Sequence, residues 1–244
     1  MENLLLVAAT VLCGGCASIT FFGKKPARTA LVLWCAVGGL VLCAAGLLVF
    51  YLLNGNFEYA YVYNHTSIGL PPVYRVSALW SGQEGSLLLW AAVLAGTGFF
   101  LLKDLKKRPR VFGAYTALCL LVLVMCCLSQ PFARLDPVPP DGLGLARALQ
   151  DPWMVAHPPV LFIGYAAATV PFAYAIAALL RKDFSTWIER SRRWTLFTMT
   201  SLGIGIFLGG YWAYKVLGWG GYWGWDPVEN SSLIPWLALV ALVH

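Results

Sequence analysis

Six long apolar stretches constrain the fold of this chain more than any other feature of its sequence. They lie at about 3–22, 29–53, 84–102, 111–130, 158–180 and 195–216. A seventh stretch begins near Ser231 and runs to His244, and the only charged residues in all seven are Glu84 and Lys215, at the ends of theirs. A helix needs ~20 apolar residues to cross a bilayer, and lipid cannot satisfy the backbone groups of open strands. We therefore predict an all-α, polytopic membrane helix bundle with six full transmembrane helices and the start of a seventh.

The composition supports a membrane protein of one domain. Hydrophobic residues make up 59% of the chain and charged residues 11%, whereas about a quarter of a soluble domain is charged. The first residues carry no basic group, so we expect the first stretch to be a retained helix and not a cleaved signal peptide. Because the chain stops within the seventh stretch, we interpret residues 1–244 as the N-terminal part of a longer or split protein.

The basic residues predict the orientation of this bundle. Thirteen of the 17 Lys and Arg residues follow the first, third and fifth stretches, namely Lys24, Lys25, Arg28, Lys103, Lys106, Lys107, Arg108, Arg110, Arg181, Lys182, Arg190, Arg192 and Arg193. Loops rich in Lys and Arg stay on the cytoplasmic side of a membrane, so the N-terminus is predicted outside. The net charge of +6 therefore reflects topology, and we expect no nucleic-acid partner.

The segments on the predicted outer side are longer and contain the candidate functional residues. Two outer loops, 54–83 and 129–157, lack Lys and are rich in Gly, Pro and aromatic residues. Long loops on one face of a scaffold commonly carry function. His65 in the first loop and Glu84 at its end are interpreted as structural, although a role for Glu84 in a site stays open.

A third outer segment, 217–230, concentrates aromatic rings and glycines. Indole and phenol rings are broad and polarizable, and glycines let the backbone approach whatever the rings cover. We expect a flat ligand such as a porphyrin against Trp219, Gly220, Gly221, Tyr222, Trp223, Trp225, Asp226 and Pro227. Asp226 and Pro227 also predict the N-cap and first residue of the seventh helix. The alternative is an aromatic belt, since Trp and Tyr collect at membrane interfaces.

Two of the three histidines occupy positions suited to a metal ligand. His157 precedes Pro158 and Pro159, which places it at the outer mouth of the fifth helix. His244 lies about fourteen residues into the seventh helix, roughly 20 Å below its outer start. A neutral imidazole binds haem iron well, and an intramembrane histidine is a functional candidate. The alternatives are a histidine that caps its helix and a hydrogen-bonded core histidine.

The segment WGGYWGWDPVEN, residues 219–230, resembles the tryptophan-rich WWD signature of the membrane proteins that handle haem in cytochrome c maturation. Its VEN ending and the following SSLIPWL favour the CcmF/NrfE type of this family over the more distant CcsA type. Further similar stretches are 64–67, 77–90, 149–152 and 157–159. The resemblance therefore extends from about residue 57 to the C-terminus.

This resemblance implies a haem-handling subunit of the cytochrome c haem lyase. In such a system, haem comes from a CcmE-type chaperone and is attached on the outer face to an apocytochrome c with a Cys-x-x-Cys-His motif. The expected partners also include CcmH/CcmI-type lyase subunits, the rest of the CcmF-like polypeptide and the lipid bilayer. The expected location is the bacterial inner membrane, with the functional face toward the periplasm.

The resemblance also implies two haems. His157 is expected to bind the iron of a substrate haem at the WWD segment, and His244 the iron of a buried b-type haem. The second axial ligands would come from residues outside this chain, and no catalytic residue is assigned. Two alternatives stay open, a membrane exporter of haem or another flat ligand, and a redox-only subunit that carries b-type haem.

Overall fold

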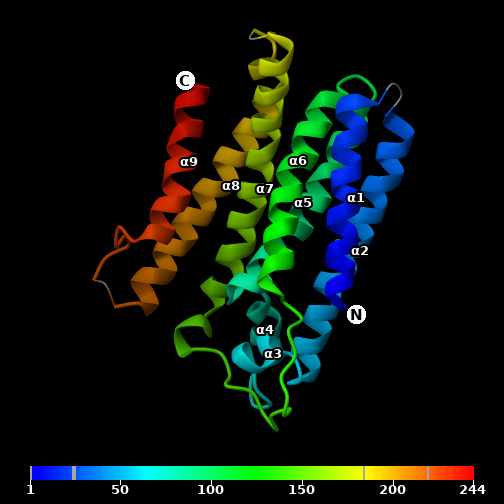
Figure 1. The fold of residues 1–244 in the computed structure, drawn as a ribbon. Coiled ribbons are helices and arrows are strands. Elements are labelled where there is room, and N and C mark those ends of the chain that lie inside the picture. The colour runs from blue at the N-terminus through cyan, green and yellow to red at the C-terminus, as the bar shows by residue number, and fades with distance from the viewer. Residues whose placement is uncertain (1, 24–25, 184, 219) are drawn as a thin grey trace.

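The computed structural model describes residues 2–23, 26–183, 185–218 and 220–244, and these residues form a bundle of long, roughly aligned helices (Figure 1). The long helices are α1 (Glu2–Phe22), α2 (Ala27–Asn54), α5 (Gln83–Leu105), α6 (Pro109–Ser129), α7 (Pro152–Arg181) and α8 (Trp187–Val216). All six are long and apolar enough to cross a membrane, whereas α9 (Pro227–Val243) has 17 residues. The predicted all-α, multi-pass membrane bundle is confirmed.

Two helices begin earlier than the apolar pattern predicted. Helix α7 starts at Pro152 and not at residue 158, because the Asp151 carboxylate accepts a hydrogen bond from the backbone N–H of Trp153, 2.9 Å away, and proline suits the first turn. Helix α8 starts at Trp187 and not at residue 195, with polar first turns. Helix α7 therefore begins where its backbone is capped and not where its side chains become apolar. His157 therefore lies inside α7.

Close packing among the first helices uses small residues at the crossings. The side chain of Trp34 on α2 is 1% exposed and meets the rings of Phe112 and Tyr115 on α6 at centroid distances of 5.5 and 5.8 Å. Gly98 on α5 lies directly against the Trp34 indole, where a Cβ would collide with the ring. Small residues that let helices approach are the usual basis of packing in lipid. This part of the bundle packs on α7 through α5 and α6.

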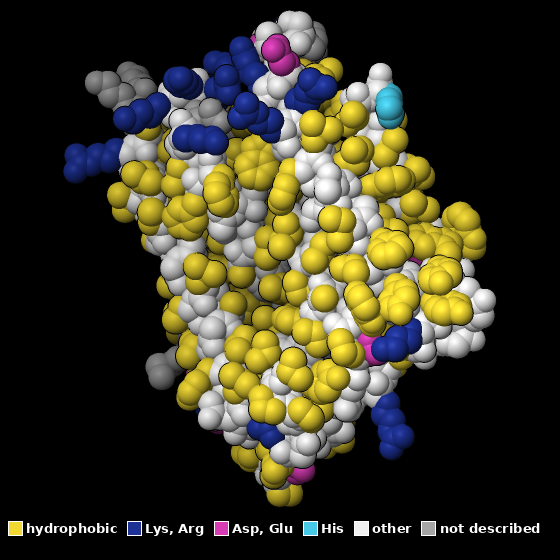
Figure 2. All heavy atoms as spheres, turned by 180° about the vertical axis from the view of Figure 1, so that it is seen from behind, with side chains coloured by type: hydrophobic (Ala, Val, Ile, Leu, Met, Phe, Trp, Pro, Cys, Tyr) yellow, Lys and Arg dark blue, Asp and Glu magenta, His cyan; other side chains and the backbone are white. Residues whose placement is uncertain are grey.

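The two ends of the bundle differ in structure and in charge. The end with the N-terminus is covered by the chain between α2 and α5, which forms α3 (Ala60–His65), α4 (Pro72–Ser77) and a 3₁₀ turn at Ala78–Trp80, and by the irregular chain before α7 (Figure 1). Lys and Arg side chains gather at the opposite end (Figure 2). The predicted long loops are thus folded against one end, and the predicted basic loops occupy the other.

Arg134 links α1 to the loop segments that cover the N-terminal end of the bundle. Its guanidinium lies 3.4 Å from a carboxylate oxygen of Glu2 and 3.4 Å from one of Glu58, and it covers the ring of Tyr59 at 5.2 Å. The Tyr59 hydroxyl donates a hydrogen bond of 2.9 Å to Glu2. Burial is the main reason that the pKa of Tyr59 is raised, so this phenol keeps its proton. The contacts hold the two loop segments over the end of α1.

Candidate functional site

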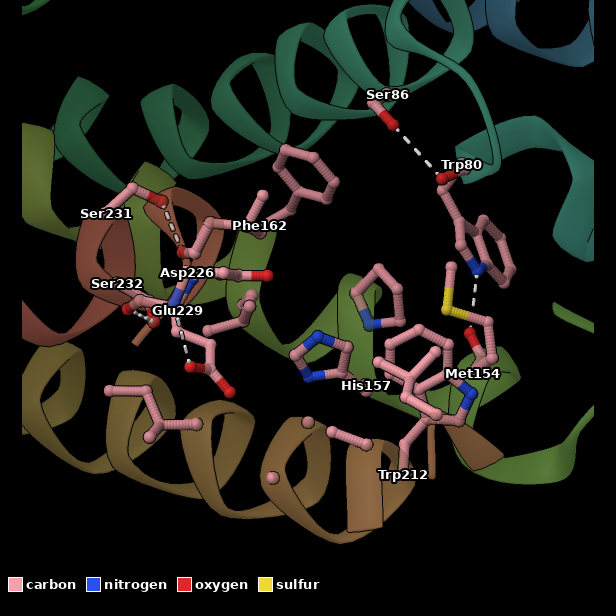
Figure 3. A pocket seen from close by; sticks show the side chains of 18 of the residues that line it. Trp80, Ser86, Met154, His157, Phe162, Trp212, Asp226, Glu229, Ser231 and Ser232 are labelled. Atoms are coloured by element: carbon pink, nitrogen blue, oxygen red, sulfur yellow. Dashed lines mark hydrogen bonds between the residues drawn. The ribbon is translucent and has the colours of Figure 1, made fainter. Parts of the chain in front are cut away.

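A cavity of about 420 Å³ opens among α7, α8 and the start of α9 (Figure 3). Its aromatic lining comes from four parts of the chain and includes Trp80, Phe162, Tyr165, Trp212 and Trp223. Pockets for small molecules and cofactors commonly measure 300–1,000 Å³, with apolar walls and a few polar groups. The cavity lies where α7 begins and α8 ends, so it belongs to the half of the bundle away from the basic end.

The His157 side chain projects into this cavity from α7 (Figure 3). Its Nδ1 lies 2.8 Å from the backbone oxygen of Gly205 on α8. A carbonyl oxygen can only accept, so Nδ1 carries the proton and Nε2 retains its lone pair. Metal-binding histidines are commonly oriented in this way, with the second nitrogen donating to a backbone carbonyl. The contact with Gly205 thus fixes both the orientation and the tautomer of the imidazole.

Gly209 leaves the space in which the His157 ring lies. A Cβ on Gly209 would collide with Cε1 of the imidazole and would lie 2.8 Å from Nδ1. Gly209 lies one helical turn after Gly205, so one face of α8 supplies both the carbonyl that holds the ring and the gap that admits it. The glycines of α8 are therefore part of the site.

The WWD segment divides between the cavity and the surface. Trp223 and Asp226 line the cavity together with His157. The indole N–H of Trp223 is buried, and no partner for it is found within the described chain. An unsatisfied buried donor is costly, and a ligand with acceptor atoms in the cavity would satisfy it. Trp219 lies outside the described residues.

The other aromatic residues of the segment face outward. Trp225 is 71% exposed and has a φ of 57°, and Tyr222 is 57% exposed and stacks on Tyr214 of α8 at 4.4 Å. Gly220 has a φ of 71°, and neither it nor Gly221 would meet a neighbouring atom within 4 Å through a Cβ. These residues form an open aromatic rim next to the cavity, where a broad ligand or a polypeptide can approach.

Asp226, Pro227 and Glu229 fold the segment back into α9. Asp226 accepts a hydrogen bond of 2.6 Å from the N–H of Glu229, and Pro227 is the first helical residue, so the predicted N-cap is confirmed. The Glu229 carboxylate accepts from the N–H of Asp226 at 3.3 Å and from that of Gly224 at 2.8 Å. This reciprocal capping box anchors both ends of the turn that carries Trp225.

Replacing Glu229 by alanine is expected to loosen this turn. The variant loses the carboxylate oxygen that accepts from the N–H groups of both Gly224 and Asp226, so we expect about 1 kcal/mol of local destabilisation. Faster proteolytic cleavage within residues 217–226 of the membrane-embedded protein would reveal it. Glu229→Gln is the matched control, because an amide oxygen also serves in a capping box. Equal cleavage rates for all three proteins would contradict the anchoring role.

Several lining residues were missed by the sequence analysis. Trp80 donates from its indole N–H to the backbone oxygen of Met154 at 3.0 Å, and Trp212 donates to that of Ala148 at 3.1 Å. The Trp80 indole therefore links the start of α7 to the 3₁₀ turn at Ala78–Trp80. The Trp212 indole links α8 to the 3₁₀ turn at Arg147–Leu149, and both rings line the cavity. Trp80 lies within the 77–90 stretch that carries the family resemblance, and this resemblance could have identified it as a candidate site residue. Met154 and Trp212 are brought to the site by the fold alone.

The remaining histidines lie elsewhere. His244 ends α9, is exposed, and is not among the described residues that line the cavity. His65 packs at the covered end, where its Nδ1 lies 2.8 Å from the backbone oxygen of Tyr61 and its ring stacks on that of Tyr61 at 4.2 Å. Burial raises the pKa of Tyr61, whose hydroxyl donates to Ala78 and Leu79 at 2.8 and 3.0 Å. These contacts support the structural interpretation of His65.

Three further polar residues have local roles. Glu84 lies in the first turn of α5, where a carboxylate is favoured. Lys215 pairs with Asp151 at 2.9 Å across α8 and the start of α7. Arg75 donates to the backbone oxygens of Leu70 and Leu53 at 2.8 and 2.9 Å. Neither basic residue is among the described lining residues of the cavity.

The donor set of the cavity fits a haem. An imidazole with a fixed tautomer would supply a ligand to the iron, and the indole and phenyl rings would supply apolar surface for a macrocycle. Among the described residues, no group of three or more His, Cys, Asp or Glu is placed to hold a metal ion by itself. A single histidine in an aromatic cavity suits an iron that arrives within a porphyrin better than a bare metal ion.

Comparisons with known proteins identify the family of this chain. A family model for cytochrome C assembly proteins matches residues 80–244. The chain is 45% identical over 215 residues to the cytochrome c-type biogenesis protein CcmF of Pseudomonas fluorescens, an alignment that covers 84% of this chain and 32% of that protein. It is 41% identical over 211 residues to the cytochrome c-type biogenesis protein NrfE of Haemophilus influenzae, covering 82% of this chain and 32% of that one.

A solved structure extends the similarity to the whole chain. The cytochrome c haem lyase CcmF superposes with a TM-score of 0.83 at 32% sequence identity, over 100% of this chain and 40% of that protein. The chain spans about a third of the length of the curated relatives. The expected resemblance to the CcmF/NrfE type is confirmed. Because the family model covers more than half of its residues, the chain belongs to the cytochrome c assembly protein family.

Proposed function

We propose that this chain is the haem-handling part of a cytochrome c haem lyase subunit. The observation that carries the proposal is the His157 imidazole, held by the Gly205 carbonyl at 2.8 Å inside a cavity that Trp223 also lines. One ring nitrogen is committed to the protein, so the other is available to iron. The aromatic rim at Tyr222 and Trp225 lies beside this cavity and offers a flat surface to a second polypeptide.

The residues act by position and not by chemical reaction of their own. His157 would bind the iron, and the aromatic walls of the cavity would lie against the macrocycle. The substrate haem supplies vinyl groups, and each cysteine thiol of an apocytochrome adds across one of them. Sulfur bonds to one vinyl carbon and hydrogen to the other, so the addition needs no external oxidant or reductant. A rigidly held haem edge favours this step by fixing its orientation.

In our proposal, this chemistry takes place on the periplasmic side of the membrane. Basic side chains gather at the end opposite the cavity and would face the cytoplasm of a bacterial inner membrane (Figure 2). The cavity would then open toward the periplasm. There, haem would come from a CcmE-type chaperone and pass to an apocytochrome c with a Cys-x-x-Cys-His motif, assisted by CcmH/CcmI-type subunits.

A second haem is proposed at the other end of α9. His244 is separated from the cavity by the length of this 17-residue helix and is exposed at its end. An imidazole at that position within the membrane suits one axial ligand of a b-type haem, with the second ligand supplied by another part of the complete protein.

Reconstitution in vesicles tests the proposed function. The complete protein with its lyase subunits is supplied with ferrous haem and an apocytochrome that carries Cys-x-x-Cys-His. We expect haem that resists acid–acetone extraction and gives a c-type pyridine haemochrome, because two thioethers form. An apocytochrome with serines in place of both cysteines is the control and should gain none. Haem movement across the vesicles without apocytochrome, and without covalent product when it is present, would instead indicate an exporter.

A further inference from the structure

A second cavity, of about 580 Å³, lies on the outside of the bundle toward its basic end. It is a groove between α5 and α8, both of which pack on α7. Its walls include Phe100 and Lys103 from α5 and Arg193, Trp194 and Phe197 from α8, and Ile163 of α7 also lines it. None of these residues lines the cavity that contains His157, so the groove is a separate feature of the fold.

The groove has an apolar body that remains accessible. Phe100 is 64% exposed and Phe197 is 50% exposed, although each packs against the Trp194 indole, at centroid distances of 6.4 and 6.3 Å. A Cβ on Gly96 would meet nothing within 4 Å, so the α5 wall is hollowed at that position. Aromatic and aliphatic surface of this kind, on a helix bundle in a bilayer, suits acyl chains.

The groove also has a positively charged end. Lys103 stands in the last turn of α5 and Arg193 in the second turn of α8, and both are exposed. They come from helices on opposite sides of the groove. Lys and Arg side chains gather over this end of the molecule (Figure 2). Two cations above an apolar groove match a molecule with an anionic head and hydrocarbon tails.

We propose that this groove binds an anionic phospholipid of the leaflet at the basic end. The phosphate lies between Lys103 and Arg193, and the acyl chains follow Phe100, Trp194 and Phe197 toward Ile163. Basic pockets between transmembrane helices are suited to anionic headgroups, and a tryptophan near the interface is suited to the level of the headgroup–chain junction. The proposal rests on the fold and on charge, and it stands independently of the haem site.

Native mass spectrometry of the complete protein in detergent tests the site, with phosphatidylglycerol and phosphatidylcholine as probes. We expect one phosphatidylglycerol to bind more tightly than any phosphatidylcholine. Replacing Lys103 and Arg193 together by glutamine should weaken the phosphatidylglycerol about tenfold and leave phosphatidylcholine unchanged. Gly96→Leu fills the hollow without altering charge and should weaken both lipids.

The matched control replaces two basic residues at the same end that do not line the groove, Lys107 and Arg192, by glutamine. This pair changes the net charge equally and should retain the tight phosphatidylglycerol. The proposal is overturned if the control pair weakens binding as much as the Lys103 and Arg193 pair, or if the two lipids bind equally to the unmodified protein. Retention of full binding by both the charge variant and Gly96→Leu would also overturn it. Unchanged elution on gel filtration establishes that each variant is folded.

Discussion

Replacing His157 by alanine in the complete protein is expected to lower the rate of covalent haem attachment at least about 100-fold. Loss of a second-shell partner alone commonly costs 10- to 100-fold in metal affinity, and His157 is the proposed ligand itself. The substitution removes the one imidazole among the described residues that line the cavity. The measurement is the amount of c-type pyridine haemochrome formed on an apocytochrome over time.

Two further variants separate loss of the ligand from loss of the fold. His157→Gly leaves a space at the ring position, so added imidazole should restore part of the activity. His65→Ala removes a histidine that stacks on Tyr61 away from the cavity and should retain haem attachment within a few-fold. Full activity of a folded His157→Ala protein would contradict the proposed role of His157 as an iron ligand. A b-type absorption signal that survives in His157→Ala would be consistent with a second haem at His244.

The sequence predicted the membrane bundle well because bilayer physics leaves few choices. Uncharged apolar runs of about 20 residues become spanning helices, and all six predicted stretches lie largely within α1, α2, α5, α6, α7 and α8. The start of α9 was equally predictable, because Asp226 and Pro227 form a local capping signal that needs no tertiary contact. Features that depend only on residues close together in the sequence were therefore predictable.

The set of residues that forms the site was harder to predict from the sequence, because it depends on contacts between helices. The sequence placed His157 before its helix, whereas the cap at Asp151 lengthens α7 and turns the imidazole toward Gly205 and Gly209. It also treated the aromatic residues of the WWD segment as one surface, whereas Trp223 lines the cavity and Trp225 is exposed. Backbone dihedrals such as the φ of 57° at Trp225 decide this division, and composition does not reveal them.

The space that the His157 ring needs explains why α8 has a glycine at the cavity. Glycine inside a helix usually destabilises it by roughly 0.5–1 kcal/mol relative to alanine. At Gly209 the small residue is nonetheless required by the position of the His157 ring, because a Cβ there would collide with Cε1. Gly209 therefore lowers the local stability of α8, but it permits a close contact between the imidazole and the helix, and this contact fixes the orientation of the ring.

Replacing Gly209 by alanine is therefore expected to lower haem attachment on the order of 100-fold, although His157 itself is retained. The added methyl group must push the ring away from the Gly205 carbonyl, and a displacement near 1 Å in a reacting geometry can cost about that factor. The same apocytochrome assay measures the rate, and the absorption spectrum reports whether haem still binds and with what ligation.

Gly46→Ala on α2 is the matched control for this experiment. It makes the same change inside a helix, but its Cβ would meet nothing within 4 Å, so activity should be retained and the helix slightly stabilised. A Gly209→Ala protein that is folded, retains haem with altered ligation and fails in attachment would assign the defect to the imidazole position. Wild-type rates in that variant would mean that the His157 ring tolerates displacement, and the proposed role of α8 in orienting the ligand would be wrong.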